Sequence, residues 1–283
     1  MTSCRHPLPA TDAWHYGMLR TQYKFTHGRF FIFKSRKMFK TLSFLVVFMV
    51  ASANLAAQKP VQHDIWDALL KKHVRKDGFV DYKGFVKDSA RLNQYLEVLS
   101  SAHPQSSWSR AEQMAYWINA YNAFTVKLIV QHYPVASIKD IKKGIPLVNS
   151  VWDIKFIHIQ DKTYDLNNIE HDILRPQFKD ARIHAAINCA SYSCPRLHNE
   201  AFTAAKLEQQ LEAVTRSFVN DPLRNRIKAD RAELSAIFNW FGGDFKRDAG
   251  SVRAFVNKYA QVKVKDTGKI TFIDYDWSLN DVK

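Results

Sequence analysis

The segment from Ala115 to Val130 constrains the fold more than any other part of the chain, because it is apolar on nearly every face of a helix. It lies within SWSRAEQMAYWINAYNAFTVKLIVQHYP, where Ser107 or Ser109 offers an N-cap and Pro134 a terminator. A helix that is apolar all round is buried on several sides. The sequence therefore predicts one long central helix with the rest of the chain packed around it.

Two asparagines, Asn119 and Asn122, interrupt this apolar segment. Burying an amide without a hydrogen-bond partner costs about 1–3 kcal/mol, so both side chains must be bonded. In one interpretation they tie the central helix to the backbone of neighbouring loops. In the other they line a site beside the helix, where Asn119 would stabilise an oxyanion and Asn122 would bind a ligand.

Other segments show the apolar spacing typical of helices or the alternation typical of strands. Helices are predicted over 61–75, 88–102, 165–175 (ended by Pro176), 199–221 and 251–260, and strands over 151–159, 182–190 and within 268–281. A turn with a short extended piece is predicted over 76–85, and a strand or short helix with a Gly-Gly turn over 232–245. We find no linker, so 58–283 is predicted to be a single α+β domain, helix-rich with a small, mostly antiparallel sheet.

Residues 38–57, MFKTLSFLVVFMVASANLAA, have the layout of a signal peptide, with an early lysine, an apolar stretch and small residues that favour cleavage after Ala53 or Ala57. The apolar stretch is shorter than the length of about 20 residues that a membrane-spanning helix needs. We expect Met38 to be the true start and residues 1–37 to be a mis-assigned extension; the alternative is a cytoplasmic tail with an uncleaved anchor. The mature protein is then periplasmic or secreted, with no stable membrane span.

The net charge of +14 overstates how basic the mature chain is. Residues 1–57 hold eight Lys and Arg and one Asp, which leaves 33 positive and 26 negative residues, or +7, for the other 226. That charge suits contact with acidic surfaces or substrates. We find no zinc-finger spacing, RNA-binding aromatic signature or long basic block. The expected partner is an unknown small molecule or peptide, with no nucleic acid and no cofactor.

Five motifs occur in order between about Asp81 and Asp281: AYWINAYNAFTVKLI, LNNIEHDILR, RIHAAINCASYSCPRL, LSAIFNWFGGDF and YDWSLN. Together they resemble the domain-of-unknown-function 547 family, which occurs in bacterial exported proteins and in plant proteins and has no settled activity. More distantly, the chain resembles the papain-like and transglutaminase-like fold group. That resemblance implies a nucleophilic cysteine at a helix start and a histidine on a nearby strand. The chain departs from this layout, because its central helix holds no cysteine near Trp117.

The segment RIHAAINCASYSCPRLHNEAF gathers thiols and imidazoles that can carry chemistry. As a nucleophile, Cys189 needs a base or a positive environment to form a thiolate near neutral pH. The candidate bases are His184 and His171. A carboxylate would orient the imidazole, and the candidates are Glu170, beside His171, and Asp276 in the tail.

Strand geometry weighs against a direct pair of His184 and Cys189. In a regular strand over 182–190, His184 and Asn188 share one face and Cys189 lies on the other. The pair therefore requires a bulge or turn near Asn188, which the segment NCASYS permits. His171 escapes this objection, because it arrives on a different element. Arg175, four residues later, would pair with an acid or with a substrate carboxylate.

Two other uses of the cysteines remain open. Cys189 and Cys194 enclose four residues, and a disulfide between them in an oxidising compartment would shape the loop. The family resemblance implies that this bridge is dispensable, since plant members often have serine at the position of Cys194. With His198 the spacing becomes C-x4-C-x3-H, but zinc sites use tighter pairs and a fourth ligand, so no metal site is predicted.

The leading hypothesis is a cysteine-dependent hydrolase or acyl transferase that acts on an amide, ester or thioester. Its nucleophile would be Cys189, its base His184 or His171, and its orienting carboxylate Glu170. A periplasmic thiol-redox protein is a third possibility. The main alternative is a non-catalytic domain with a structural Cys189–Cys194 disulfide that binds a small ligand or peptide through Asn122, Arg175 and Asn188.

Overall fold

The computed structural model describes residues 58–141 and 150–282. The expected start extension (1–37) and signal peptide (38–57) lie outside the described residues. Within those residues helices predominate, and the strands form one pair and one three-stranded sheet. The predicted α+β class is confirmed.

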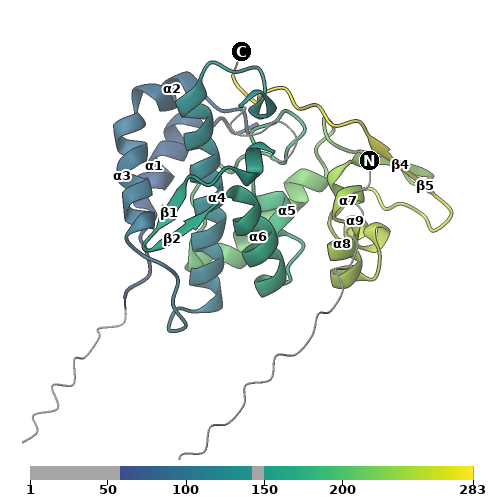
Figure 1. Cartoon of the computed structure of the whole chain (residues 1–283). Helices are drawn as coiled ribbons and strands as arrows, with labels where there is room; N and C mark the ends of the chain where they lie inside the picture. The colour runs from purple at the N-terminus through teal and green to yellow at the C-terminus, as the bar shows by residue number, and fades with distance from the viewer. Residues whose placement is uncertain (1–57, 142–149, 283) are drawn as a thin grey trace, which may run out of the picture. The chain divides into compact units, whose positions relative to one another are not determined.

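The long central helix is α4, Arg110–His132 (Figure 1). A capping box starts it: the Ser109 hydroxyl accepts from the Glu112 N–H, and the Glu112 carboxylate accepts from the Ser109 N–H. Nearly all side chains from Met114 to Ile129 are buried. The central helix predicted from the apolar segment is thus confirmed, with Ser109 as its cap.

Three helices before α4 cover one side of it, and they are α1 (Asp64–His73), α2 (Tyr82–Lys87) and α3 (Ser89–Ser100). The helices predicted over 61–75 and 88–102 are confirmed. The prediction of an extended piece was wrong beyond residue 81, because the Asp81 side chain accepts from the Gly84 N–H and starts α2 there.

After α4 come two 3-10 turns, η1 (Ile138–Asp140) and η2 (Val151–Asp153), and the hairpin of β1 (Ile157–Ile159) and β2 (Lys162–Tyr164). Only the end of the predicted strand 151–159 is therefore extended. Its first part turns instead, because the Asp153 carboxylate accepts from both the N–H and the hydroxyl of Ser150.

The helix predicted over 165–175 is η3, Asn168–Phe178, which is wound with the wide turns of a π-helix. The Asp165 carboxylate accepts from the Asn168 N–H and so caps it. The prediction that Pro176 ends this helix was wrong, since Pro176 lies inside it. In an α-helix the proline ring clashes with the carbonyl four residues earlier, and wider turns relieve that contact.

The prediction of a buried strand over 182–190 was wrong. Residues Ile183–Ala186 form the short helix α5, and the chain becomes extended at Ile187. All four helical residues are buried. A short apolar run fits a buried strand and a buried helical turn equally well, because periodicity cannot separate them.

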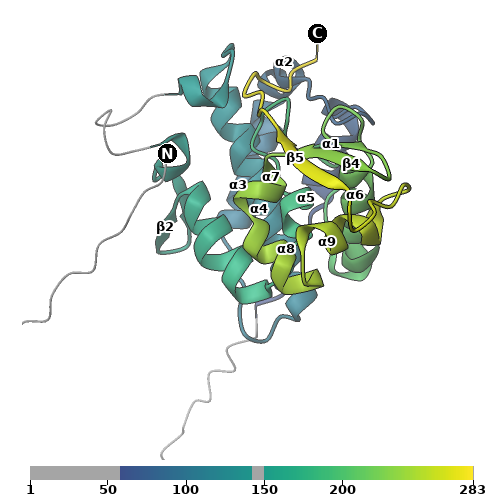
Figure 2. The same cartoon turned by 90° about the vertical axis from the view of Figure 1, so that its right-hand side faces the viewer.

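The remaining elements are η4 (Ala204–Lys206), α6 (Leu207–Val219), β3 (Arg226–Ile227), β4 (Arg231–Ser235), α7 (Ile237–Trp240), α8 (Gly242–Ala249), α9 (Val252–Tyr259) and β5 (Lys269–Ile273). The sheet order is β3-β4-β5, with β3 antiparallel to β4. Strand β5 runs parallel to β4, and Figure 2 shows these two side by side. The predicted closing strand and the helix over 251–260 are confirmed. The helix predicted over 199–221 starts later than expected, and Gly242 and Gly243 begin α8 rather than forming a turn.

The C-terminal tail docks on the loop that carries the cysteines. The Tyr192 N–H donates to the Ser278 carbonyl, and the Ser193 N–H donates to the Asp276 carbonyl. The Asp276 carboxylate accepts from the Ser278 N–H, so it holds the tail turn and does not orient an imidazole. The tail thereby fixes the loop 189–195 against the body of the domain.

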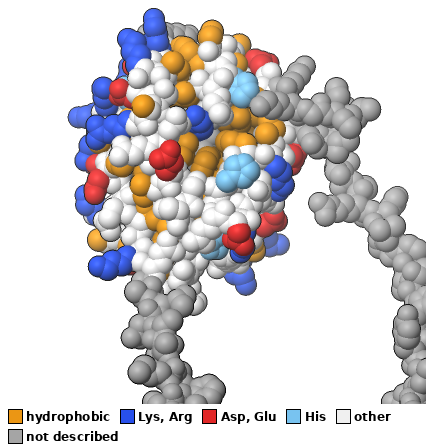
Figure 3. Space-filling model, turned by 60° about the vertical axis from the view of Figure 1, so that its left-hand side comes forward, with side chains coloured by type: hydrophobic (Ala, Val, Ile, Leu, Met, Phe, Trp, Pro, Cys, Tyr) orange, Lys and Arg blue, Asp and Glu red, His pale blue; other side chains and the backbone are white. Residues whose placement is uncertain are grey.

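On the face shown in Figure 3, Lys and Arg side chains gather along one edge and acidic side chains lie scattered among them. This mixture matches the mild positive charge of residues 58–283. Over the ranges that the structure describes, we find no helix both long enough and apolar enough to cross a membrane.

Candidate functional site

A pocket of about 170 Å³ lies where the cysteine loop meets η3, α5, α7 and the C-terminal tail. Polar groups gather on two sides of it, and aromatic rings form much of the rest. Its lining consists of Tyr121, Trp152, Asn167, Glu170, His171, His184, Ile187, Cys189, Cys194, Pro195, Ile237, Trp240, Phe241, Tyr275 and Trp277. Candidate residues distant in sequence are therefore brought to one cavity.

The two cysteines form a hydrogen-bonded pair of free thiols. The Cys189 N–H donates to Cys194 Sγ at 2.9 Å, and Cys189 Sγ lies 3.3 Å from the hydroxyl oxygens of both Ser191 and Tyr275. Cys189 is partly exposed, whereas Cys194 is buried. Cys189 is therefore the more accessible residue of the two.

Ionisation of this pair is made easier by its surroundings. Burial alone would raise the pKa of Cys194, but hydrogen bonds from Cys189, Tyr275 and Ser191 lower it to about 6. The hydrogen bond to Cys194, together with burial, raises the pKa of Cys189 well above its usual value. The pair therefore loses its first proton readily and its second with difficulty, and one thiol is left to share a proton with one thiolate.

Backbone ties hold the cysteine loop in place. Ala190 adopts a left-handed conformation with φ of 61°, which turns the chain directly after Cys189. The Asn188 carboxamide accepts from the Ala190 N–H and donates to the Pro195 carbonyl. A buried guanidinium, that of Arg224, donates to the Cys194 carbonyl. Asn188 is thus a structural residue of this turn, and the turn expected near it does exist.

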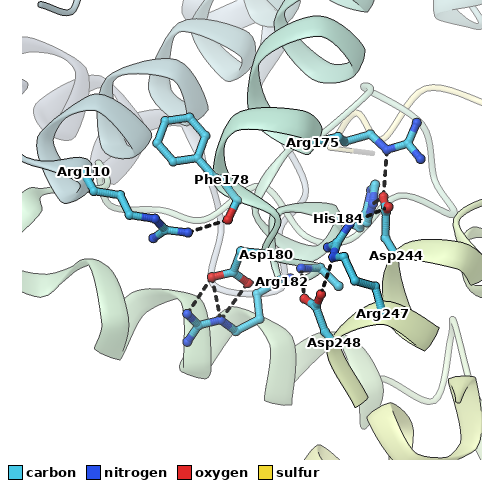
Figure 4. A network of polar contacts seen from close by, with 10 residues as sticks. Arg110, Arg175, Phe178, Asp180, Arg182, His184, Asp244, Arg247 and Asp248 are labelled. Atoms are coloured by element: carbon cyan, nitrogen blue, oxygen red, sulfur yellow. Dashed lines mark hydrogen bonds and ion pairs between the residues drawn. The ribbon is translucent and has the colours of Figure 1, made fainter. Parts of the chain in front are cut away.

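His184 also lines the pocket, and Asp244 holds its ring in place. Its Nε2–H donates to Asp244 Oδ2 at 2.9 Å, and its ring stacks on Phe241 with centroids 4.0 Å apart. Asp244 also accepts from Arg175 Nε at 2.7 Å and from Arg247 at 2.9 Å, so that three cationic or imidazole groups converge on one carboxylate (Figure 4).

The protonation states of this pair follow from these contacts. The hydrogen bond from His184 and the guanidinium of Arg175 hold the pKa of Asp244 well below its usual value. Burial lowers the pKa of His184 despite the opposing effect of Asp244. Asp244 is therefore ionised and His184 neutral near pH 7, which leaves the Nδ1 lone pair of His184 free.

Glu170 faces that lone pair. Its Oε1 lies 3.8 Å from His184 Nδ1, and its carboxyl group hydrogen-bonds the hydroxyl of Tyr121. Burial raises the pKa of Glu170 to about 7, although the positive charge of Arg175 opposes this. Glu170 therefore holds a proton up to about pH 7 beside a neutral imidazole.

The expected partnership of Glu170 with His171 is not formed. Successive residues on a helix do not face each other, and Glu170 points to His184 instead. His171 Nδ1 accepts from Arg175 Nη1 at 2.9 Å, and its ring stacks on Phe241. His171 belongs to the pocket wall, and Arg175 lies behind that wall, where its two other partners are Asp244 and the face of Phe241.

Neither imidazole of the pocket hydrogen-bonds a cysteine among the described residues. The hydrogen-bond partners of the Cys189 side chain there are Cys194, Ser191 and Tyr275. His198, which completed the C-x4-C-x3-H spacing, lies in another pocket, beside Phe202. Within the described parts of the chain, no cluster of three His, Cys, Asp or Glu side chains is suited to hold a metal ion.

Asn119 and Asn122 both bond backbone. The amide of Asn119 donates to the Phe202 carbonyl and accepts from the Phe202 N–H, and Asn119 does not line the pocket. The amide of Asn122 donates to the Ala186 carbonyl and accepts from the Asn188 N–H. We therefore assign both residues the tying role and leave the oxyanion role of Asn119 and the ligand role of Asn122 aside. Through Asn122, the central helix positions the loop that carries Cys189.

Several functional groups of the pocket escaped sequence reasoning. Asp244 and Tyr275 lie 60 and 86 residues from their respective partners, His184 and Cys189. Both occur in motifs that resemble the family, FGGDF and YDWSLN, and that was their only signal. The hydroxyl of Ser191, which donates to Tyr275 at 2.9 Å, was part of a segment read only as a turn.

The pKa of Glu170 makes folding stability depend on pH. The folded protein keeps this proton up to about pH 7, whereas the unfolded chain releases it near 4.5, so stability falls as the pH rises through that interval. The stability of the Glu170→Gln variant is expected not to fall over this interval. At about pH 8 its free energy of unfolding should exceed that of the wild type by up to about 3 kcal/mol. Urea unfolding at both ends of the interval measures it. Exposed Glu97→Gln is the control, and parallel wild-type and Glu170→Gln profiles would contradict the expectation.

Comparison with known proteins gives one match. Residues 105–219 match the model of a family described as "Protein of unknown function, DUF547". Searches of curated proteins and of solved structures returned no match. The matched region contains α4, η3, α5 and α6 and the first three of the five motifs. The papain-like and transglutaminase-like fold stays a prediction, whereas the family resemblance is confirmed. Over residues 105–219, the chain therefore resembles the DUF547 family of proteins of unknown function.

Proposed function

We propose that the pocket is the active site of a cysteine-dependent hydrolase or acyl transferase that acts on an ester, thioester or amide. One observation carries the proposal: an ionisable thiol pair, Cys189 with Cys194, shares a small cavity with the proton-holding pair Glu170 and His184. Acyl transfer needs a nucleophile for the carbonyl carbon and a proton donor for the leaving group.

The nucleophile is formed within the thiol pair. The Cys194 thiolate takes the proton of the Cys189 thiol, and Cys189 Sγ, the sulfur of the more accessible residue, attacks the carbonyl carbon. Cys194 thus plays the part that a histidine plays in other cysteine enzymes. This arrangement explains how Cys189 can react without an imidazole in hydrogen-bond contact.

A separate group, Glu170, protonates the leaving group. Glu170 holds a proton near neutral pH, and neutral His184 lies next to it. The carboxyl proton passes to the departing oxygen, sulfur or nitrogen, either directly or by way of His184 Nδ1. Asp244 keeps the His184 ring in the orientation that presents Nδ1 to the pocket. Water or another acceptor then releases the acyl group from Cys189.

A non-catalytic binding domain is the second candidate. It is favoured by the lack of a cysteine–imidazole hydrogen bond in residues 58–141 and 150–282 and by the aromatic lining of the pocket. In that case the ligand would occupy the same cavity, and the thiols would be inert. Export to the periplasm or the medium, predicted from residues 38–57, stays part of either proposal.

Thiol reactivity separates the two candidates. We expect iodoacetamide to alkylate Cys189 with an apparent pKa well below the ordinary thiol value of about 8.5, because the pair shares its charge. The Cys194→Ala variant should raise this apparent pKa, since the remaining thiol loses its partner. The rate of alkylation as a function of pH, with peptide mapping by mass spectrometry, measures both. A wild-type thiol that is unreactive, or that titrates at 8.5 or above, would contradict the catalytic proposal.

A further inference from the structure

Beside the thiol pair, the wall of the pocket is aromatic, and Tyr275 joins the two through the contact of its hydroxyl with Cys189 Sγ at 3.3 Å. Trp240, Tyr275 and Trp277 pack on one another, with ring centroids 4.8 Å apart for Trp240 and Tyr275 and 4.5 Å apart for Tyr275 and Trp277. Trp152 extends the wall, at 5.3 Å from Trp277. These rings come from three separate parts of the chain, namely η2, α7 and the C-terminal tail.

From this wall we infer the substrate class of the proposed reaction: a neutral acyl group of about the size of hexanoyl or benzoyl, held against Trp240 and Trp277 while Cys189 attacks its carbonyl carbon. The inference rests on the proposed function. The wall would bind the acyl group. The thiol pair and Glu170 would act on the ester, thioester or amide bond at its carbonyl carbon.

The volume of the cavity sets the size of the group. An apolar cavity of about 150 Å³ in a protein interior binds benzene. The pocket measures about 170 Å³, which leaves room for one ring or a short chain but not for a long acyl chain. Each methylene placed against the rings instead of water favours binding by about fourfold, until the cavity is full.

Charge excludes ionic acyl groups. Aromatic rings attract cations, but Lys139 Nζ already lies 4.9 Å from the Trp277 ring and the Arg175 guanidinium lies 5.0 Å from the Phe241 ring. A cationic substrate would be repelled by both. An anionic substrate would be repelled by the negative charge of the thiol pair. A neutral group avoids both costs.

Trp240 is the residue that limits the length of the group. Its side chain is 49% exposed, so solvent lies directly behind the part of the wall that it forms. Removing its ring would open the pocket outward while leaving Tyr275 and Trp277 in place. The structure thus assigns Trp240 a role in specificity, distinct from the chemistry at Cys189.

A series of p-nitrophenyl esters tests this role by kcat/KM. For the wild type, kcat/KM should rise about fourfold per methylene from acetate through butyrate to hexanoate, stay high for benzoate and fall for octanoate and dodecanoate. The 6-aminohexanoate ester should react poorly. Trp240→Ala should raise the octanoate-to-hexanoate ratio at least tenfold, and Trp240→Phe, which preserves packing, should raise it less. The matched control is Leu223→Ala, because Leu223 is 51% exposed and does not line the pocket. This variant should leave the octanoate-to-hexanoate ratio unchanged.

The outcomes distinguish this inference from the proposed function. The inference is overturned if hydrolysis depends on Cys189 but kcat/KM does not change with chain length. It is also overturned if Trp240→Ala and Trp240→Phe keep the chain-length profile of the wild type. Either result leaves the proposed function standing. If no ester is hydrolysed in a Cys189-dependent way, both are overturned. A maximum at hexanoate or benzoate that moves to longer chains in Trp240→Ala supports both.

Discussion

The Cys189→Ser variant is expected to lose at least about a thousandfold in kcat/KM toward p-nitrophenyl acetate, because loss of the nucleophile removes the covalent step. A serine hydroxyl is far less acidic than a thiol, so the Cys194 thiolate cannot deprotonate it. Circular dichroism spectra and urea midpoints of variant and wild type establish that the fold is kept. Stopped-flow or steady-state release of p-nitrophenolate measures the rate.

Cys194→Ala is the matched comparison. Its activity near neutral pH should fall less than that of Cys189→Ser and should recover as the pH approaches the ordinary thiol pKa of about 8.5, because Cys189 then ionises without its partner. If Cys194→Ala were inactive at every pH while Cys189→Ser kept its activity, the assignment of Cys189 as nucleophile would be reversed.

The Asp244→Ala variant is expected to unfold more easily, by about 1–3 kcal/mol, because the buried His184 ring and the partly exposed guanidinium groups of Arg175 and Arg247 lose their acceptor. Asp244 accepts from His184, Arg175 and Arg247 at 2.9, 2.7 and 2.9 Å. Asp244→Asn keeps an acceptor for these donors and should lose less. Urea unfolding near pH 7 measures both, with exposed Asp230→Ala as the control.

The Asp244 effect depends on pH with a defined sign. Because its contacts hold the folded-state pKa of Asp244 well below the unfolded value of about 3.9, the contribution is complete above that value. It is lost as the pH falls through the folded-state pKa. The gap in stability between wild type and Asp244→Ala should therefore be full near pH 7 and shrink in strong acid. Equal urea midpoints for the two proteins near pH 7 would show that the network does not stabilise the fold.

The parts of the fold that were predicted correctly are those with long periodic patterns. The apolar segment around Ala115–Val130 identified α4, and amphipathic spacing identified α1, α3, α6 and α9. The prediction of a strand over 182–190 failed because the segment is short and its helical part is buried on all sides. Its apolar pattern therefore shows no period that separates a strand from a helix. The objection from strand alternation to a His184–Cys189 pair therefore rested on a strand that the chain does not form.

The candidate site was predicted in part. Cys189, His184, His171, Glu170 and Arg175 do line or border one pocket, but their partners differ from those expected. Adjacency in the sequence suggests that Glu170 partners His171, whereas η3 turns Glu170 toward His184. Asp244 was not predicted because its hydrogen bond with His184 joins residues that are 60 positions apart in the sequence. Such contacts depend on tertiary packing, which a single sequence does not display.

Direct observation of an acyl-enzyme tests the central claim most closely. Wild-type protein is mixed with p-nitrophenyl hexanoate, quenched in acid within one turnover, and examined by intact mass and peptide mapping. The account predicts one hexanoyl group, attached to Cys189, and none in Cys189→Ser. Hydrolysis without an adduct on Cys189, or an adduct on Ser191 or Cys194 instead, would contradict it.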